Sequence, residues 1–201
     1  MSGGTPVTLR RAADAAPQPW RNGGGSTREL LAWPAGGAWQ LRISVAEIAA
    51  DGPFSAYEGV QRWFAVIDGA GVVLGFADGE RRLEPGAGVL QFDGADAPAC
   101  RLIDGPTHDL NLMLRSGVRG TLERAVTGAA WDAPWRWRAV FTAGAARLHA
   151  VGAAPVDLAA GTLAHPLPPG PYRIEPHDPH APAFWIGADL ALEACPGGAA
   201  R

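Results

Sequence analysis

Polar and aromatic side chains that could perform chemistry are concentrated in four short stretches of the chain. The first is Trp20-Arg21-Asn22-Gly23-Gly24-Gly25-Ser26-Thr27-Arg28-Glu29, in which an indole, an amide, a hydroxyl and a carboxylate surround three glycines. Asn-Gly favours a tight turn because both residues tolerate positive φ. Three glycines exceed what a turn requires, and they let the backbone approach a ligand or a crossing strand closely. By itself this stretch predicts either a hairpin corner or one wall of a small-molecule pocket.

The other stretches carry polar side chains at strand-like spacing. Alternate residues of a β-strand share a face, so each polar pair points to one side and its apolar neighbours point to the other. The pairs are Thr27 with Glu29, Arg42 with Ser44, and Asp109 with Asn111, and Arg62 adds a second cation. A polar face on one strand ordinarily contacts solvent. Here the opposite faces are densely apolar, which favours polar faces that converge on a cavity.

A converging set of this kind suits a small carboxylate or amide ligand. Arg42 and Arg62 can bind a carboxylate through paired N–H donors. Amide and hydroxyl side chains can recognise an amide or formyl group, while aromatic rings supply apolar walls. A buried acidic residue of the set requires an arginine as its partner. We predict the ligand-binding residues to be Trp20, Asn22, Thr27, Glu29, Arg42, Ser44, Phe54, Ser55, Arg62, Asp109 and Asn111.

The elements that must position these residues are predicted to be short β-strands. Apolar runs bounded by Gly, Pro and Asp recur at roughly 8 to 12 residues, which is the spacing of an all-β sandwich or barrel. Strict alternation over residues 39–45 and 108–114 separates an apolar from a polar face in each strand. Short helical segments are expected near residues 45–50 or 118–126.

An internal repeat predicts two related units in the chain. Gly69, Leu83 and Gly86 are matched at one constant offset by Gly144, Leu158 and Gly161, with similar strand patterns around them. We therefore expect two related β-barrels. The expected divisions are a first barrel over residues 1–115, a connection over 116–136, a second, smaller barrel over 137–195 and a frayed tail over 196–201. The tryptophans of residues 131–137 are expected to pack between the barrels, with a homodimer interface as the alternative.

Composition excludes several classes of protein. A formal net charge of −3 over 201 residues gives no electrostatic basis for binding nucleic acid or a membrane surface. No apolar run approaches the roughly 18 residues of a transmembrane helix, and the first seven residues lack the apolar core of a signal peptide. A cytoplasmic protein is expected. Cys100 and Cys195 suggest neither a disulfide framework nor a metal motif, and both are expected to be reduced.

Together the four stretches resemble the HutD/Ves family of bacterial cupin-like proteins. The matching motifs are Trp20-x-Asn22-Gly-Gly-Gly-x-Thr27-x-Glu29, Arg42-x-Ser44, Asp51-Gly-Pro-Phe-Ser55-x-x-x-Gly59-Val60-x-Arg62 and Asp104-Gly-Pro-x-x-Asp109-Leu-Asn111-Leu-Met113. They occur in the family's order and span roughly residues 20–115, over half of the chain. The resemblance implies an all-β cupin fold, an RmlC-like jelly roll, arranged as a bicupin. For one branch of the family it implies an association with histidine utilisation, and it brings no catalytic activity with it.

The metal ligands of a typical cupin are missing from the sequence. Such a cupin places two histidines and a glutamate before the glycine turn and a third histidine on a later strand, whereas residues 56–63 contain no histidine. On the later strand, His108 is expected on the apolar face. His165 and the loop histidines His177 and His180 have no neighbouring cysteines with which to complete a zinc site. We therefore expect neither a metal nor another cofactor.

Three functional interpretations follow. The favoured one is a non-catalytic binding protein or metabolite sensor that modulates histidine utilisation by binding a small carboxylate or formyl-amide, such as N-formylglutamate or formate. The second is a metal-independent isomerase or hydrolase, with Glu29 or Asp109 as general base and an arginine as carboxylate clamp. The third is a stress-related or structural protein with a vestigial pocket. The sequence contains no Ser-His-Asp arrangement, phosphate loop or redox motif, which favours the sensor.

Overall fold

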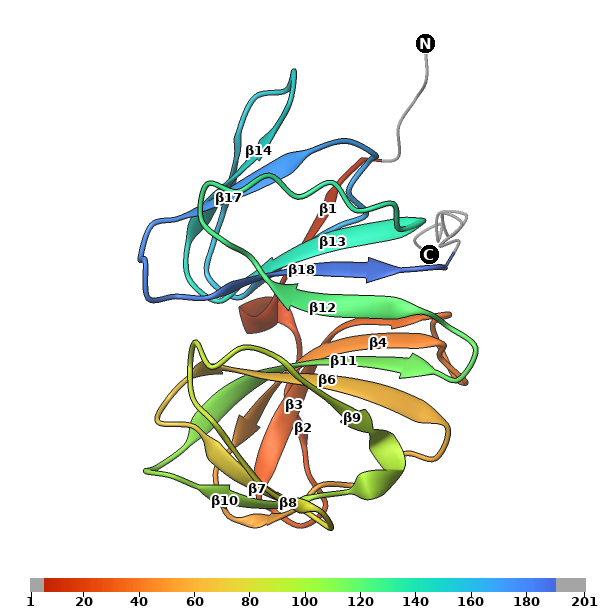
Figure 1. Ribbon diagram of the computed structural model, residues 1–201, viewed down its shortest axis with the longest axis vertical. Helices are drawn as coiled ribbons and strands as arrows, with labels where there is room; N and C mark the ends of the chain where they lie inside the picture. The colour runs from red at the N-terminus through yellow and green to blue at the C-terminus, as the bar shows by residue number, and fades with distance from the viewer. Residues whose placement is uncertain (1–5, 191–201) are drawn as a thin grey trace.

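The strand pattern of the sequence folds into antiparallel sheets that form two stacked units (Figure 1). The structure is a computed structural model and describes residues 6–190. Within these residues, helix is limited to single 3₁₀ turns at Ala12–Asp14 (η1) and Gly94–Asp96 (η2). Over residues 6–190 there is thus no helix that is long and apolar enough to cross a lipid bilayer. The all-β class predicted from the sequence is confirmed.

The N-terminal unit consists of a large and a small sheet. Its large sheet has the strand order β2 (Gln18–Pro19), β3 (Gly25–Trp33), β4 (Leu41–Ile48), β11 (Thr107–Arg115), β6 (Val60–Asp68) and β9 (Leu90–Asp93). Its small sheet has the order β5 (Gly52–Pro53), β10 (Ala99–Leu102), β7 (Val72–Phe76) and β8 (Gly79–Leu83). The two sheets enclose an apolar core that includes Phe64, Leu74 and Phe92.

The C-terminal unit repeats this strand order. Its large sheet runs β1 (Thr8–Arg11), β16 (Thr162–His165), β13 (Trp137–Thr142), β18 (Ala183–Ala188) and β12 (Gly120–Arg124). Its small sheet runs β15 (Val156–Leu158), β14 (Ala146–Ala150) and β17 (Tyr172–Pro176). Hence β4-β11-β6-β9 corresponds to β12-β18-β13-β16, and β10-β7-β8 corresponds to β17-β14-β15. The repeat of glycine and leucine positions in the sequence thus coincides with a repeat of topology.

Close backbone packing explains two of the repeated glycines. A Cβ at Gly69 would lie 2.8 Å from the Cα of Thr107, and a Cβ at Gly144 would lie 2.6 Å from the Cβ of Ala181. Thr107 begins β11, and Ala181 stands just before β18, which is the equivalent strand of the other unit. Each unit therefore needs a residue without a side chain where the chain leaves the equivalent strands β6 and β13.

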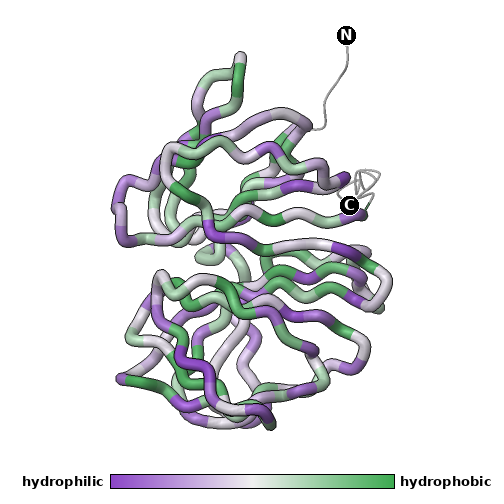
Figure 2. The backbone as a smooth tube through the Cα atoms, in the orientation of Figure 1, coloured by the Kyte–Doolittle hydropathy of each residue, from purple (hydrophilic) through white to green (hydrophobic). Residues whose placement is uncertain are grey.

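The two units pack against each other through their large sheets. Alternate residues of β4 and β11, such as Ile43 and Leu112, contact residues of β13 and β18, such as Phe141 and Ile186, in one buried cluster. Figure 2 shows apolar residues on the strands where the units meet. The face of the N-terminal large sheet that was predicted to be apolar is therefore buried between the units, and its polar face lies inside the N-terminal unit.

Several expectations about local structure need correction. Residues 45–48 belong to β4 and residues 120–124 to β12, so the helical segments expected near 45–50 and 118–126 were wrong. In both regions successive side chains point to opposite faces of the sheet. In β12, for example, Leu122 is buried in the core between the units while Glu123 is exposed.

The unit boundaries also differ from those expected at residues 1–115 and 116–136. Strand β1 pairs with β16, and β12 pairs with β18, so both strands belong to the C-terminal unit. Sequence order alone does not specify such pairing of distant strands. The tail over 196–201 and Cys195 lie outside the described residues, whereas Cys100 is a buried free thiol.

The tryptophans of residues 131–137 pack in two different parts of the molecule. Trp137 lies in the core between the units, as predicted. Trp131 instead lies inside the C-terminal unit, where its ring stacks on Trp185 at a centroid distance of 4.9 Å and an interplanar angle of 3°. The expectation of inter-unit packing was therefore wrong for Trp131.

Candidate functional site

A cavity of about 610 Å³ opens between the two sheets of the N-terminal unit. Its floor is the inner face of the large sheet, and its walls come from the segments before β3 and after β5. The lining residues are Gln18, Pro19, Trp20, Arg21, Asn22, Thr27, Arg42, Ser44, Ala46, Ile48, Pro53, Phe54, Ser55, Tyr57, Arg62, Asp109, Asn111 and Met113. A volume of this size accommodates a small metabolite.

Strand register brings the polar residues of the floor together. Asn111 on β11 lies opposite Ser44 on β4, and Met113 lies opposite Arg42 on β4 and Arg62 on β6. Residues paired in this way project to the same side of a sheet about 5 Å apart. The period-two alternation of each strand therefore gathers side chains that are far apart in sequence onto one wall of the cavity.

Arg62 is held at the floor by aromatic rings and one amide. Its guanidinium carbon lies 4.9 Å from the centroid of Phe54 and 5.1 Å from that of Phe92, which is within cation–π range. Its Nη2 donates a hydrogen bond of 2.8 Å to Oδ1 of Asn111. Its Nε is buried and has no hydrogen-bond partner among residues 6–190. Burial lowers the pKa of Arg62, an effect that the carboxyl of Asp109 partly offsets.

Asp109 extends this contact into a chain of three polar side chains. Nδ2 of Asn111 donates to Oδ1 of Asp109, while the buried Oδ2 has no partner in the described part of the chain. Asp109 is only 1% exposed. Burial raises its pKa to about 8, against the opposing influence of Arg62 and of the Asn111 hydrogen bond. The chain of three side chains thus ends in a buried guanidinium N–H and a buried carboxyl oxygen that have no hydrogen-bond partner among residues 6–190.

The rim of the cavity is held by a second set of contacts. Nε1 of Trp20 donates to Oγ1 of Thr27 at 2.8 Å, and Nε of Arg42 donates to Oε2 of Glu29 at the same distance. Gly25 lies beneath the indole, because a Cβ there would be 2.1 Å from the backbone oxygen of Glu47 and 3.0 Å from the Trp20 ring. At this position the glycine stretch accommodates a crossing strand, which was one of the two predicted reasons for it.

The structure brings together nearly all of the residues predicted from the sequence. Every predicted residue except Glu29 lines the cavity, and Glu29 is the ion-pair partner of the lining residue Arg42. Sequence reasoning missed eight of the lining residues, namely Gln18, Pro19, Arg21, Ala46, Ile48, Pro53, Tyr57 and Met113. Met113 shares its strand face with Asp109 and Asn111, so alternation already pointed to it. Tyr57 lies within the motif that ends at Arg62, but nothing about its spacing distinguished it.

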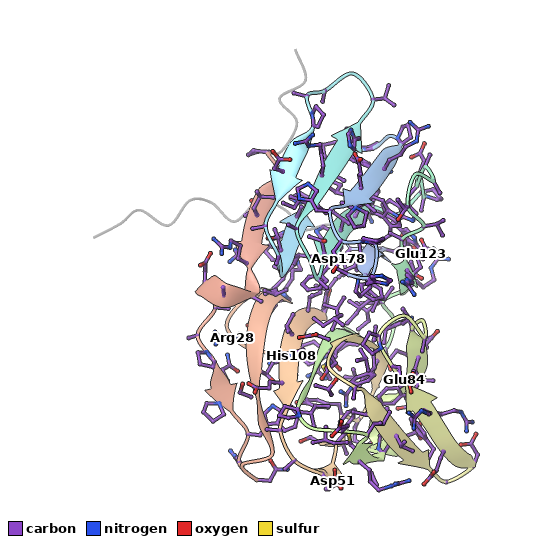
Figure 3. All side chains as sticks on the ribbon, turned by 90° about the vertical axis from the view of Figure 1, so that its left-hand side faces the viewer. Arg28, Asp51, Glu84, His108, Glu123 and Asp178 are labelled. Atoms are coloured by element: carbon purple, nitrogen blue, oxygen red, sulfur yellow. The ribbon has the colours of Figure 1, made fainter. Side chains whose placement is uncertain are left out.

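Histidines do not gather at the site. His108 belongs to the N-terminal unit and interacts with Asp68, whereas Asp178, in the loop of His177 and His180, belongs to the C-terminal unit (Figure 3). His165 is buried in β16. Over the range that the structure describes, no three His, Cys, Asp or Glu side chains lie close enough together to share a metal ion.

The fold and the cavity define a cupin-type protein with a polar interior in one of its units. Among solved structures, the oxalate decarboxylase of Lactobacillus farciminis superposes with a TM-score of 0.55 at 12% identity over 92% of this chain and 86% of that one. At such low identity the likeness concerns the fold alone.

The HutD family model matches residues 12–168, and the chain belongs to this family. The match includes every residue that lines the cavity, and the membership predicted from the four motifs is confirmed. Solved structures of similar proteins agree with this assignment. A conserved protein of unknown function from Pseudomonas aeruginosa is 25% identical, with a TM-score of 0.81 over 92% of this chain and all of that one. The HutD protein of Pseudomonas fluorescens is 27% identical, with a TM-score of 0.76 over 91% and 98% of the two chains.

Curated relatives match over a shorter span. An uncharacterised protein of the hutC 3′ region of Pseudomonas putida is 36% identical over 114 residues, which is 53% of this chain and 57% of that protein. The protein Ves of Citrobacter koseri is 35% identical over 102 residues, 48% of this chain and 51% of that protein. The matched region thus spans about half the length of these relatives.

Proposed function

We propose that this protein is a non-catalytic metabolite sensor whose N-terminal unit binds a small carboxylate or formyl-amide. The observation that carries the proposal is the buried chain Arg62–Asn111–Asp109 at the floor of the cavity, in which Arg62 lines the cavity and forms no ion pair among residues 6–190. A guanidinium without an ion-pair partner in a desolvated site gains most from an anionic or carbonyl acceptor.

N-Formylglutamate and formate fit the chemistry of this site. A carboxylate or formyl oxygen can accept a hydrogen bond from the guanidinium of Arg62, and the lining hydroxyl of Ser44 can bond to a formyl-amide. The HutD structure from P. fluorescens was obtained in a formate condition, and the P. putida relative is named for the hutC region. These names support a ligand from histidine utilisation, a pathway that this protein would modulate by binding one of its metabolites.

A second candidate function rests on the raised pKa of Asp109. A buried carboxyl group whose pKa lies near 8, facing a cavity of substrate size, is also what a metal-independent hydrolase or isomerase would use as an acid or base. Incubation of the protein with N-formyl-L-glutamate, followed by ¹H NMR, separates the two functions. The sensor leaves the compound intact, whereas a hydrolase releases formate and glutamate.

Isothermal titration of wild type, Arg62→Ala and Arg101→Ala with N-formyl-L-glutamate tests the binding function. Removing one partner of a buried charged contact costs about 2 kcal/mol or more, so Arg62→Ala should weaken binding by about 30-fold or more. Arg101 forms an exposed ion pair with Glu80 in the small sheet of the same unit, so Arg101→Ala should bind like wild type. Equal affinities for all three proteins would contradict the proposal.

A further inference from the structure

We infer that the cavity binds its anion only when Asp109 is protonated and uncharged, so that the charge of Arg62 stays available to the anion. This inference rests on the proposed anion-binding function and deepens it. Asp109 then acts through Arg62 and couples binding to pH.

The position of the proton follows from the hydrogen bonds of Asn111. Because Oδ1 of Asn111 accepts from Nη2 of Arg62 at 2.8 Å, the amide nitrogen faces Asp109. That nitrogen donates to Oδ1 of Asp109, which leaves Oδ2 as the oxygen able to carry a proton. Oδ2 is buried and lacks a partner within residues 6–190, although Asp109 lines the cavity. Asp109 is therefore linked to the guanidinium of Arg62 through Asn111, and its uncharged form carries the proton on Oδ2.

The charges around Asp109 favour the neutral form when an anion is bound. The titratable groups around it are Arg62 on β6, Arg42 on β4, Cys100 on β10 and Tyr57 in the segment before β6. Arg42 is paired with Glu29, and the thiol of Cys100 is neutral because burial raises its pKa to about 12.

This arrangement leaves Arg62 as the main positive charge on the cavity floor. An ionised Asp109 would cancel that charge and repel an incoming anion, whereas a neutral Asp109 leaves it available. By linkage, the bound anion must in turn raise the pKa of Asp109.

The same linkage sets the expected dependence of affinity on pH. In the free protein, burial raises the pKa of Asp109 to about 8, so the carboxyl group is mostly protonated at pH 7. Affinity should be nearly constant between pH 6 and 7 and about tenfold weaker at pH 9 than at pH 7. A site whose affinity did not depend on the charge of Asp109 would show no such loss over this range.

Isothermal titration with sodium formate and with N-formyl-L-glutamate at pH 6, 7, 8 and 9 tests this inference on three proteins. Wild type should lose affinity above pH 8. Asp109→Asn should bind with an affinity independent of pH, because an amide is uncharged at every pH. Asp132→Asn is the matched control, since Asp132 is the partner of Arg138 in the C-terminal unit, and it should behave like wild type.

Each outcome decides the inference. Wild-type affinity that is equal at pH 7 and pH 9, or a pH dependence that persists in Asp109→Asn, overturns it and leaves the binding function standing. Failure of both probes to bind at any pH overturns the inference and the binding function together. If Asp109→Asn does not fold, ¹³C NMR of aspartate carboxyls in the wild type provides the test. One carboxyl signal should titrate near pH 8 and move to higher pH with saturating formate, and the absence of any aspartate titration above pH 7 overturns the inference.

Discussion

The two units of the molecule use the same strand order but fill their interiors differently. Each has a buried arginine on the inner face of an equivalent strand: Arg62 on β6 lies opposite Met113, and Arg138 on β13 lies opposite Gly187. Each guanidinium also lies over aromatic rings, which for Arg138 are those of Trp131 and Tyr172, at 5.0 and 5.4 Å. The framework therefore provides the same arginine position twice.

The surroundings of the two arginines differ in what occupies the adjacent space. In the N-terminal unit, Asn111 pairs with Phe64 across the strands. At the equivalent position of the C-terminal unit, Trp185 pairs with Val140. Trp185 stacks on Trp131, which fills the interior. The Nη atoms of Arg138 are bonded to Asp132 at 3.1 Å and to the backbone oxygen of Gly170 at 2.5 Å. Arg138 thus ties loops to the sheet, whereas Arg62 faces a cavity.

Gly187 leaves space for a further aromatic ring, Trp135, to pack in the C-terminal unit. A Cβ at this position would lie 2.0 Å from a ring carbon of Trp135, so only glycine lets that indole pack against the strand. The comparison indicates that the duplicated framework separates two tasks. One unit retains aromatic packing that contributes stability, and the other gives up packing for a polar cavity.

The largest expected effect comes from opening the filled interior. Trp185→Ala should destabilise the protein by about 3–5 kcal/mol, because it removes a stacked ring that is 3% exposed. Urea unfolding followed by circular dichroism measures this change. The equivalent substitution in the N-terminal unit, Asn111→Ala, should cost about 1–3 kcal/mol, because it leaves two polar neighbours unpaired. Equal losses in both variants would break the distinction between a packed and a ligand-binding interior.

The arginines themselves sharpen the comparison with a smaller effect. Arg138→Met should cost about 2 kcal/mol, because the Asp132 and Gly170 contacts are lost. Arg62→Met should cost only about 1 kcal/mol, because the loss of the single hydrogen bond to Asn111 is partly offset by removing a desolvated charge from among aromatic rings. The midpoints of urea unfolding provide the measurement, and a greater loss in Arg62→Met than in Arg138→Met would contradict the proposed division of tasks.

The pH dependence of stability has opposite signs in the two units. The raised pKa of Asp109 favours the folded state most below pH 4, and this contribution is lost as the pH rises through about 8. Burial lowers the pKa of His165 to about 4, with a smaller contribution from Arg10, so its contribution is present above pH 6.5 and is lost as the pH falls through about 4. Each slope is at most about 1.4 kcal/mol per pH unit.

Two variants separate these slopes in urea unfolding between pH 4 and pH 9. Asp109→Asn should remove the loss of stability toward alkaline pH and leave the loss toward acidic pH unchanged. His165→Leu should remove the loss toward acidic pH, because both ring nitrogens of His165 are buried without a partner in the part of the chain described. A wild-type slope that persists in its corresponding variant would show that the assigned group does not cause it.

Alternation of residue types predicted much of the fold and of the candidate site. Leu110 and Leu112 were expected to face away from Asp109 and Asn111, and they do so because one face of β11 packs between the units and the other lines the cavity. The repeated glycines and leucines likewise predicted two related units. These features depend on local periodicity, which a sequence displays directly.

The pairing of distant strands and the side-chain packing of the two interiors could not be predicted in this way. The sequence did not indicate that β1 would join the C-terminal unit, because an exposed edge strand can pair with any free edge. It did not distinguish Trp131, which packs within one unit, from Trp137, which packs between the two. The equivalence of Arg138 with Arg62 was also hidden, because it depends on cross-strand register and not on a shared motif.

The most direct test of a ligand site in one unit and a packed interior in the other is a crystal structure at saturating N-formyl-L-glutamate. The account predicts a carboxylate or formyl oxygen about 3 Å from a guanidinium nitrogen of Arg62, with no ligand beside Arg138. A ligand bound beside Arg138, or a cavity around Arg62 that contains only water, would contradict it.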